Sequence, residues 1–120
     1  MTQDARLSGA STKQRVFGDQ KNAPGDPFLR PFFETAVERV WGGVWNRSGL
    51  DLKHRSLVVV SVLAANGQRE ELKRHLRGAL NLGWTGDKLR EALLQISGYA
   101  GYAAAHEALR GLSEIVTAPP

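Results

Sequence analysis

The 120-residue sequence contains no cysteine. This absence excludes disulfides, a thiolate nucleophile and cysteine-based metal sites, and it fits a protein kept in a reducing compartment. No stretch approaches the ~20 consecutive apolar residues of a membrane-spanning helix. Residues 1–13 lack the apolar centre of a signal peptide. The sequence therefore predicts a cytoplasmic protein without a membrane partner.

Several catalytic and ligand-binding motifs are also missing. The three histidines, His54, His75 and His106, have no spacing of the HExxH or HxH kind, so no metal site is predicted. There is no phosphate-binding loop with its glycines and no Gly-x-Ser-x-Gly nucleophile elbow. These absences argue against metallohydrolases, nucleotide-binding proteins and serine hydrolases of the α/β type.

Charge is nearly balanced along the chain. Sixteen basic residues face twelve acidic ones, which gives a net charge of +4. The two signs alternate in stretches such as "REELKR" and "DKLRE" instead of forming a basic patch with exposed aromatics. The pattern predicts no nucleic-acid partner, while a modest excess of arginine fits a pocket for a small carboxylate or phosphate equally well.

The chain changes character at residue 27. Residues 1–26 are rich in Ser, Thr, Gln, Asn, Asp and Gly, so they are expected to form an N-terminal arm or loop, with a helical turn only around 13–18. Residues 27–120 are expected to form one helical domain. Because 120 residues support one core better than two, a second independent domain is not expected.

Apolar spacing predicts helices throughout the second region. We expect helices over about 28–44, 52–66 and 68–82, with Gly67 and Gly83 ending the last two. The run "LVVVSVL" within 52–66 has a strand-like composition, but its segment is too long and too clearly capped for a buried strand. No alternating strand pattern is present, so the predicted fold is all-α.

The C-terminal third is predicted to hold one more helical pair. Thr85 is a candidate N-cap for a helix whose core stripe contains Leu89, Leu93 and Ile96. The following "GYAGYAAAHEALRGLSEIV" keeps helical character, but Gly98 and Gly101 allow a break or a close approach of another helix. The whole is a succession of helical hairpins.

One pair of residues points to acid–base chemistry. Glu71 precedes His75 by four residues on the predicted helix, so its carboxylate can orient the imidazole and raise its basicity. Such a pair is competent for general acid–base catalysis when it lines a pocket. The ordinary alternative is a solvated pair that only supports its helix, and spacing alone favours that alternative.

Two further sets of residues have both a structural and a functional interpretation. Trp41 and Trp45 fit a core or interface, and alternatively the flat walls of a ligand pocket. Arg55 and Arg77 fit a solvated surface, and alternatively the cations that bind a substrate carboxylate. Either interpretation is compatible with the sequence.

Several segments together resemble the γ-carboxymuconolactone decarboxylase family. The resemblance covers about residues 28–116 and is carried by "WGGVWNRSGLDLKHRSL", "REELKRHLRGALNLGWT" and "LREALLQISGYAGYAAAHEALR" in this order. It implies the all-α fold shared with alkyl hydroperoxidase D and a homo-oligomer, a hexamer or trimer. The peroxidase branch of that fold carries a Cys-x-x-Cys pair, which Gln68 and Glu71 replace here, so thiol peroxidase chemistry is excluded.

The function that the resemblance implies is a decarboxylation without a cofactor. In that reaction γ-carboxymuconolactone becomes the β-ketoadipate enol-lactone, in the catabolism of aromatic compounds through protocatechuate. The resemblance implies that His75 is the acid and that Glu71 orients it. Arg55 and Arg77 would then bind the substrate carboxylates, and Trp41 and Trp45 would form an apolar wall.

Two alternatives remain open at this point. The first is an enzyme of the same fold that isomerises or hydrolyses another lactone or keto acid. It is supported by departures from the family pattern at His54 and Tyr102. The second is a non-catalytic helical oligomer that binds a ligand or a partner protein. It would leave Glu71 and His75 without a role in chemistry.

Overall fold

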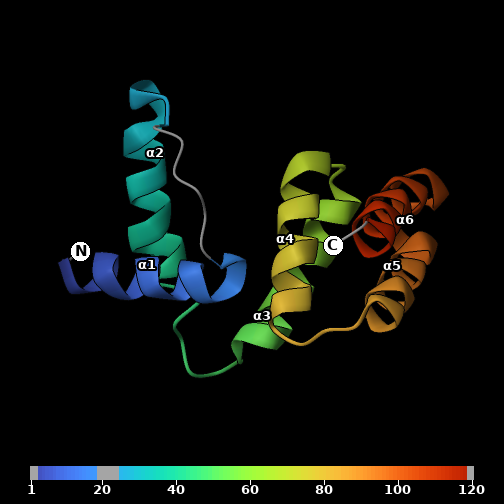
Figure 1. The fold of residues 1–120 in the computed structure, drawn as a ribbon, viewed down its shortest axis with the longest axis horizontal. Coiled ribbons are helices and arrows are strands. Elements are labelled where there is room, and N and C mark those ends of the chain that lie inside the picture. Colours follow the sequence, from blue (N-terminus) through green and yellow to red (C-terminus); the bar gives the residue numbers. More distant parts are fainter. Residues whose placement is uncertain (1–2, 19–24, 119–120) are drawn as a thin grey trace. The chain divides into compact units, whose positions relative to one another are not determined.

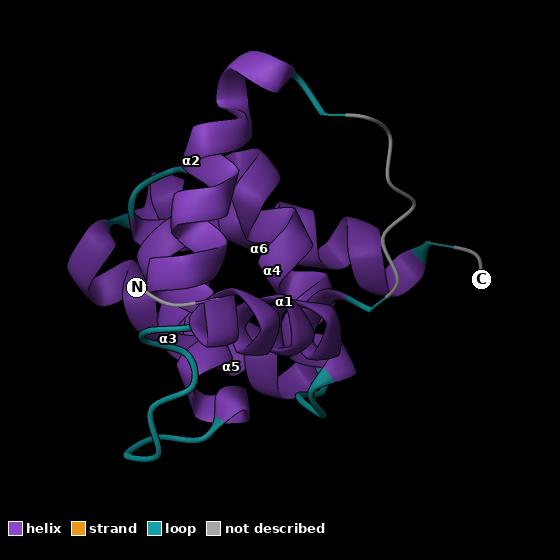
Figure 2. Ribbon diagram, turned by 90° about the vertical axis from the view of Figure 1, so that its left-hand side faces the viewer, coloured by secondary structure: helices purple, strands orange, loops and turns teal. Residues whose placement is uncertain are grey.

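The structure, a computed structural model, describes residues 3–18 and 25–118. These residues form helices and turns and contain no strand (Figure 2), which confirms the predicted all-α fold. The chain divides into two compact units, Met1–Leu52 and Lys53–Pro120. The boundary predicted at residue 26 therefore falls inside the first unit.

The first unit begins with a helix that the sequence did not predict. Helix α1 spans Gln3–Phe17, so the expectation of an arm or loop over residues 1–26 is wrong for this stretch. Its buried positions are Gly9, Thr12 and Val16, spaced by three and four residues. Only one of the three is a large apolar residue, and so the stripe left no hydrophobic periodicity to detect.

Helix α1 packs closely on the second helical segment of the first unit. A Cβ atom at Gly9 would lie 2.1 Å from the carbonyl oxygen of Val37, and one at Gly42 would lie 2.3 Å from that of Ala5. Only glycine allows two helix backbones to approach so closely. Thr12 adds a hydrogen bond from its hydroxyl to the side chain of Asn46.

The predicted helix over 28–44 is present as one helical run with changing pitch. A 3₁₀ turn, η1 (Pro27–Leu29), leads into α2 (Arg30–Thr35) and then a π-helical turn, η2 (Ala36–Trp41). The carboxylate of Asp26 caps the start by accepting a hydrogen bond from the Phe28 amide at 2.9 Å. The run ends at Trp41, directly before Gly42 and Gly43.

The second unit is built from two helical pairs (Figure 1). Helices α3 (Leu52–Ala65) and α4 (Arg69–Asn81) form the first pair, and α5 (Gly86–Ala100) and α6 (Tyr102–Thr117) lie side by side as the second. Gly67, with φ +68°, ends α3, and Gly83, with φ +106°, follows α4, as predicted.

The predicted cap and break in the second pair are also present. The Thr85 hydroxyl accepts a hydrogen bond from the Lys88 amide at 3.1 Å and so caps α5. Gly101, with φ +99°, separates α5 from α6, whereas Gly98 lies within α5 with no atom near its missing Cβ. Of the two glycines, only Gly101 therefore makes the break.

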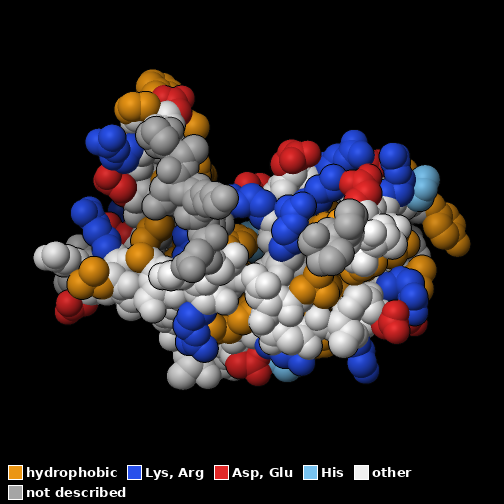
Figure 3. Space-filling view, viewed as in Figure 1, with side chains coloured by type: hydrophobic (Ala, Val, Ile, Leu, Met, Phe, Trp, Pro, Cys, Tyr) orange, Lys and Arg blue, Asp and Glu red, His pale blue; other side chains and the backbone are white. Residues whose placement is uncertain are grey.

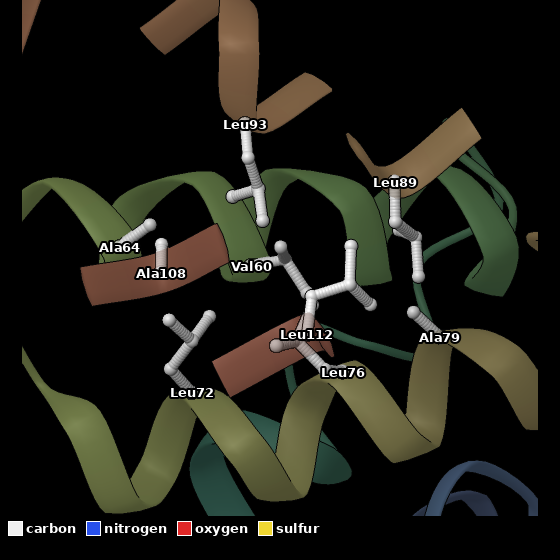
Figure 4. Packing of buried hydrophobic residues seen from close by; sticks show 9 residues of the cluster. All are labelled: Val60, Ala64, Leu72, Leu76, Ala79, Leu89, Leu93, Ala108 and Leu112. Carbon is white, nitrogen blue, oxygen red and sulfur yellow. The ribbon is translucent and has the colours of Figure 1, made fainter. Parts of the chain in front are cut away.

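Four helices contribute to the core of the second unit (Figure 4). Val60 of α3 lies opposite Leu76 of α4, while Leu89 and Leu93 of α5 close the core from the other side. The complete set of buried residues in this cluster is Val60, Ala64, Leu72, Leu76, Ala79, Leu89, Leu93, Ala108 and Leu112. The run "LVVVSVL" is therefore a helix whose one face is core.

A leucine-to-alanine pair tests this core. Leu76→Ala should lower the free energy of unfolding by about 2–5 kcal/mol, because Leu76 is fully buried and its removal leaves a cavity. Leu94→Ala is the matched control, since 47% of that leucine is exposed and its loss should cost less than about 1 kcal/mol. Urea unfolding of both variants measures the difference. Equal losses would contradict the assignment of Leu76 to the core.

Candidate active site around His75

His75 occupies a core position of α4. The buried residues Leu72, Leu76 and Ala79 define a helical stripe, and His75 lies within its spacing. Only 8% of the histidine surface is exposed. The imidazole is therefore buried and is not part of the solvent-exposed, charged surface of the helix.

Burial controls the protonation of this imidazole. The pKa of His75 is lowered from 6.5 to about 4, chiefly because burial penalises the charged ring. The nearby Glu71 carboxylate raises the pKa and the Arg74 guanidinium lowers it, both with smaller effects than burial. The sequence predicted the direction of the Glu71 effect correctly, but it missed the larger effect of burial. At neutral pH the imidazole of the free protein is uncharged.

Glu71 itself lies at the surface of α4. Its carboxylate accepts a hydrogen bond from Arg74 Nη1 at 3.2 Å, and its side chain is 53% exposed. Arg74 was not among the predicted site residues, although its position three residues after Glu71 indicates such an ion pair. The carboxylate is therefore shared electrostatically between Arg74 and His75.

The two candidate arginines lie in different environments. Arg55 is half-buried on α3, whereas Arg77 is exposed on α4. Arg77 follows His75 by two residues, which places their side chains about 200° apart around the helix axis. The structure therefore does not bring Arg77 and His75 together on one side of α4.

Trp41 and Trp45 form the interior of the first unit. Their rings stack with centroids 4.6 Å apart and an interplanar angle of 17°, and Phe17 packs edge-on against Trp41 at 5.3 Å. Both tryptophans are buried. These contacts account for their burial by packing, and their predicted role as a substrate wall stays a prediction.

Trp84 and His54 have a structural explanation in the second unit. The Trp84 indole N–H donates a hydrogen bond to the Lys53 carbonyl oxygen at 2.6 Å, and the Lys53 ammonium lies 4.6 Å from the centre of the ring. His54 packs edge-on against the same ring at 5.6 Å. These contacts fix Trp84 against the start of α3. His54 and His106 are both exposed.

Two pockets are lined by described residues of the second unit. One, of about 300 Å³, is lined by residues of α3, α4 and α6, including Leu72 and Ala108, with Arg69 and Lys73 beside them. The other, of about 420 Å³, lies between the start of α5 and the end of α6. Neither pocket is lined by any of the six predicted site residues, and both basic residues of the first pocket form ion pairs with acids of α6.

Basic and acidic side chains are mixed on the face of the second unit that Figure 3 shows. Figure 3 shows Lys and Arg interleaved with Asp and Glu over the face that carries α4 and α6. Charges of this unit also pair within one helix, as in Arg90–Asp87 on α5 and Arg110–Glu107 on α6. The described residues contain no cluster of three or more His, Asp or Glu side chains suited to a metal ion. Nor does any helix in this part of the chain have the length and apolar character needed to cross a membrane.

Comparison with known proteins gives a family match. The model of a family described as "Carboxymuconolactone decarboxylase family" matches residues 31–114, a span that contains all six predicted site residues. The chain is also similar to three curated proteins. A 4-carboxymuconolactone decarboxylase of Acinetobacter baylyi is 43% identical over 84 residues, which cover 69% of this chain and 63% of the relative.

The second relative is a nitrosuccinic acid decarboxylase, npaB, of Metarhizium robertsii. It is 42% identical over 105 residues, covering 84% of this chain and 73% of the relative. The third, an uncharacterized 15.0 kDa protein of Paracoccus denitrificans, is 33% identical over 75 residues, covering 61% of this chain and 56% of that protein. Two of the three relatives carry the name of a decarboxylase.

The lowered pKa of His75 gives a prediction for stability. Between pH 6.5 and about 4 the unfolded chain binds a proton at this histidine and the folded chain does not, so stability should fall as pH falls. The full effect of His75 is on the order of 3 kcal/mol. Urea unfolding at pH 7 and pH 4.5 measures it, with His75→Gln as the variant that cannot titrate. The same pH dependence in both proteins would contradict the burial of a neutral imidazole.

Proposed function

The chain belongs to the carboxymuconolactone decarboxylase family, and on that premise we propose that it is a cofactor-independent decarboxylase of a small carboxylic acid. Its proposed reaction is the conversion of γ-carboxymuconolactone to the β-ketoadipate enol-lactone in protocatechuate catabolism. The observation that carries the proposal is the buried imidazole of His75 inside the segment that matches the family. Because the match spans 63% of the Acinetobacter relative, the activity of that whole protein is transferred only as a proposal.

The chemistry of the lactone needs no electron acceptor outside the substrate. When CO2 leaves the γ-carbon, its bonding electron pair passes through the ring double bond to the lactone carbonyl oxygen and forms a dienolate. Protonation of the carbon next to that carbonyl completes the reaction. The protein must therefore bind the carboxylates, stabilise the negative oxygen and deliver one proton to carbon.

His75 is the proposed proton donor. Its pKa of about 4 leaves it neutral in the free protein, so it has to gain a proton before it can act as the acid. A bound dicarboxylate would provide the reason, because nearby negative charge raises the pKa of an imidazole. We infer that the substrate charges the histidine on binding, with the Glu71 carboxylate acting in the same direction.

Arg55 is the favoured cation for the substrate carboxylate. It is half-buried on α3, where partial desolvation strengthens an arginine–carboxylate pair, whereas Arg77 is exposed and points away from the side of α4 that holds His75. Arg77 can bind the substrate carboxylate only if it lies next to the active site of a neighbouring copy of the chain. The role of Trp41 and Trp45 as apolar wall residues is proposed from the sequence alone.

A second substrate is supported by the longest of the three alignments. The Metarhizium relative is named a nitrosuccinic acid decarboxylase and aligns with 84% of this chain. A nitro group accepts the electron pair of a leaving carboxylate just as a conjugated lactone carbonyl does, so one site can serve both reactions. We therefore propose the substrate class as small acids whose leaving carboxylate lies next to, or conjugated with, such an acceptor.

Exposed apolar surface supports a homo-oligomer. Phe28, Tyr99 and Tyr102 are at least 85% exposed, and Val58 and Val62 leave the outer face of α3 open to solvent. A single chain covers such surface poorly, and a second copy can bury it. A hexamer or trimer is the proposed assembly, and the reducing cytoplasm is the proposed location.

Turnover assays with the purified chain test the function. We expect CO2 release and a change in ultraviolet absorbance with γ-carboxymuconolactone, and CO2 release with nitrosuccinate if the second substrate applies. His75→Ala should lower kcat about 10²-fold, because a positioned acid contributes at least that factor. His106→Ala is the matched control, since His106 is exposed on α6.

Each of the competing functions has its own outcome in this assay. Ring opening without CO2 would identify a hydrolase, and a shifted double bond without CO2 would identify an isomerase. A chain that turns over neither substrate, yet binds one of them, would be a binding protein. A His75→Ala variant with the wild-type rate would remove His75 from the mechanism.

A pair of arginine variants tests which cation binds the substrate. Arg55→Gln should raise KM by about tenfold or more, because it removes a charge-assisted bidentate contact to a carboxylate. Arg77→Gln should leave KM unchanged within about twofold, because this side chain is exposed on the other side of α4. Steady-state kinetics on one substrate give both values. The reverse result would assign the binding role to Arg77.

A further inference from the structure

The apolar interior of the second unit contains two buried polar side chains among its described residues. One is His75, and the other is Ser56 of α3, which has no exposed surface. Every other described side chain that is fully buried in this unit is apolar or a glycine. Ser56 continues the buried stripe of Val60 and Ala64 along the helix by one more turn.

The hydroxyl of Ser56 forms no hydrogen bond within the described part of the chain. A serine inside a helix can donate to a carbonyl oxygen one turn earlier. Ser61, on the same helix, does so by donating to the Leu57 carbonyl oxygen at 2.9 Å. Four other hydroxyls of the described helices donate to the preceding turn in the same way, those of Ser8, Thr35, Ser97 and Thr117. Among the residues that the structure describes, Ser56 alone combines full burial with an unused hydroxyl.

A buried and unused donor is costly to keep in a core. Alanine would pack in the same space without a polar atom, so stability alone does not explain serine at this position. An unsatisfied group in a folded protein calls for an explanation, and a catalytic or binding role is one of those known. Packing therefore gives no reason for this hydroxyl, and binding does.

The position of Ser56 links it to the histidine. Helices α3 and α4 are consecutive and share one core, in which Val60 lies opposite Leu76 (Figure 4). Ser56 lies one turn from Val60 on the buried side of α3, and His75 is the neighbour of Leu76 on α4. The hydroxyl and the imidazole thus lie on the buried sides of two consecutive helices that share one core.

We propose that Ser56 is a substrate-binding residue whose hydroxyl donates a hydrogen bond to an anionic oxygen of the acid bound beside His75. This inference rests on the proposed function, because it takes a small carboxylic acid as the ligand. The hydroxyl donates to a carboxylate oxygen of that acid, so a ligand that carries carboxylates but no electron acceptor is held by the same bond. In the free protein the hydroxyl donates no hydrogen bond to the chain, so it is available as a donor to the substrate.

Substitution by alanine separates this role from a structural one. Ser56→Ala should lower kcat/KM by about 10- to 100-fold, the range expected for the loss of one buried donor to a charged oxygen. Its Tm should be equal to or higher than that of the wild type, because an unsatisfied buried group has been removed. Ser61→Ala is the matched control on the same helix and should keep the wild-type kcat/KM.

The binding affinity for a ligand that is not turned over tests the role of Ser56 without an activity assay. Calorimetric titration with succinate, a dicarboxylate that lacks the electron acceptor, should give a Kd at least about fivefold weaker for Ser56→Ala than for the wild type and Ser61→Ala. Absence of turnover by the wild type would refute the proposed function and leave this comparison intact.

Three results would overturn the role of Ser56. The first is a Ser56→Ala enzyme that turns over with the kcat/KM of the wild type. The second is a succinate affinity that is equal in the wild type and Ser56→Ala, or succinate binding by neither. The third is a Tm of Ser56→Ala that is lower than that of the wild type by several degrees. The first two would leave an ordered water as the partner of the hydroxyl, and the third would show that it has a structural bond.

Discussion

The exclusion of water from one imidazole is the constraint on which the proposed site depends. His75 lies in the stripe of α4 that also holds Leu72, Leu76 and Ala79, so the packing that forms the core also removes solvent from the ring. This desolvation outweighs the opposing charge of Glu71 and keeps the histidine neutral. The same helix therefore provides both stability and a group that responds strongly to any negative charge brought near it.

This arrangement connects electrostatics with the proposed specificity. A buried ring whose charged form is disfavoured gains most from a ligand that carries negative charge into the same low-dielectric region. An acid with two carboxylates brings two negative charges to the site. The product has lost one of these carboxylates, so it carries less negative charge and interacts less strongly with a charged His75. The same histidine therefore favours both binding of the substrate and release of the product.

Local signals predicted much of the second unit. Gly67, Gly83 and Gly101 have the left-handed backbone that their positions suggested, and Thr85 caps α5 through its hydroxyl. Helix α1 could not be predicted in this way, because Val16 is the one large apolar residue in a buried stripe that otherwise consists of Gly9 and Thr12. A backbone contact that depends on a missing side chain leaves no hydrophobic pattern in the sequence.

The candidate site was predicted less completely than the fold. Spacing identified Glu71 and His75 as neighbours, but the pKa of the histidine depends on how deeply the ring is buried, which one helix cannot reveal. The Arg74 partner of Glu71 follows from spacing as well, and it competes with His75 for the same carboxylate. Ser56 was hidden among the apolar residues of α3, where only its register with Val60 and Ala64 indicated burial.

The π-helical turn η2 has a consequence for the length of the first unit. A π turn contains about one residue more than an α turn. The turn η2 therefore accommodates one extra residue relative to a regular α-helix, and no loop is needed. Deleting one residue there would restore ordinary α pitch and rotate the residues after η2 by about 100° relative to α2. The stacked indoles of Trp41 and Trp45 lie at and just beyond this point. Relatives with one residue fewer in this segment would therefore have to rebuild their aromatic packing, so the insertion and the tryptophan pair should be gained or lost together.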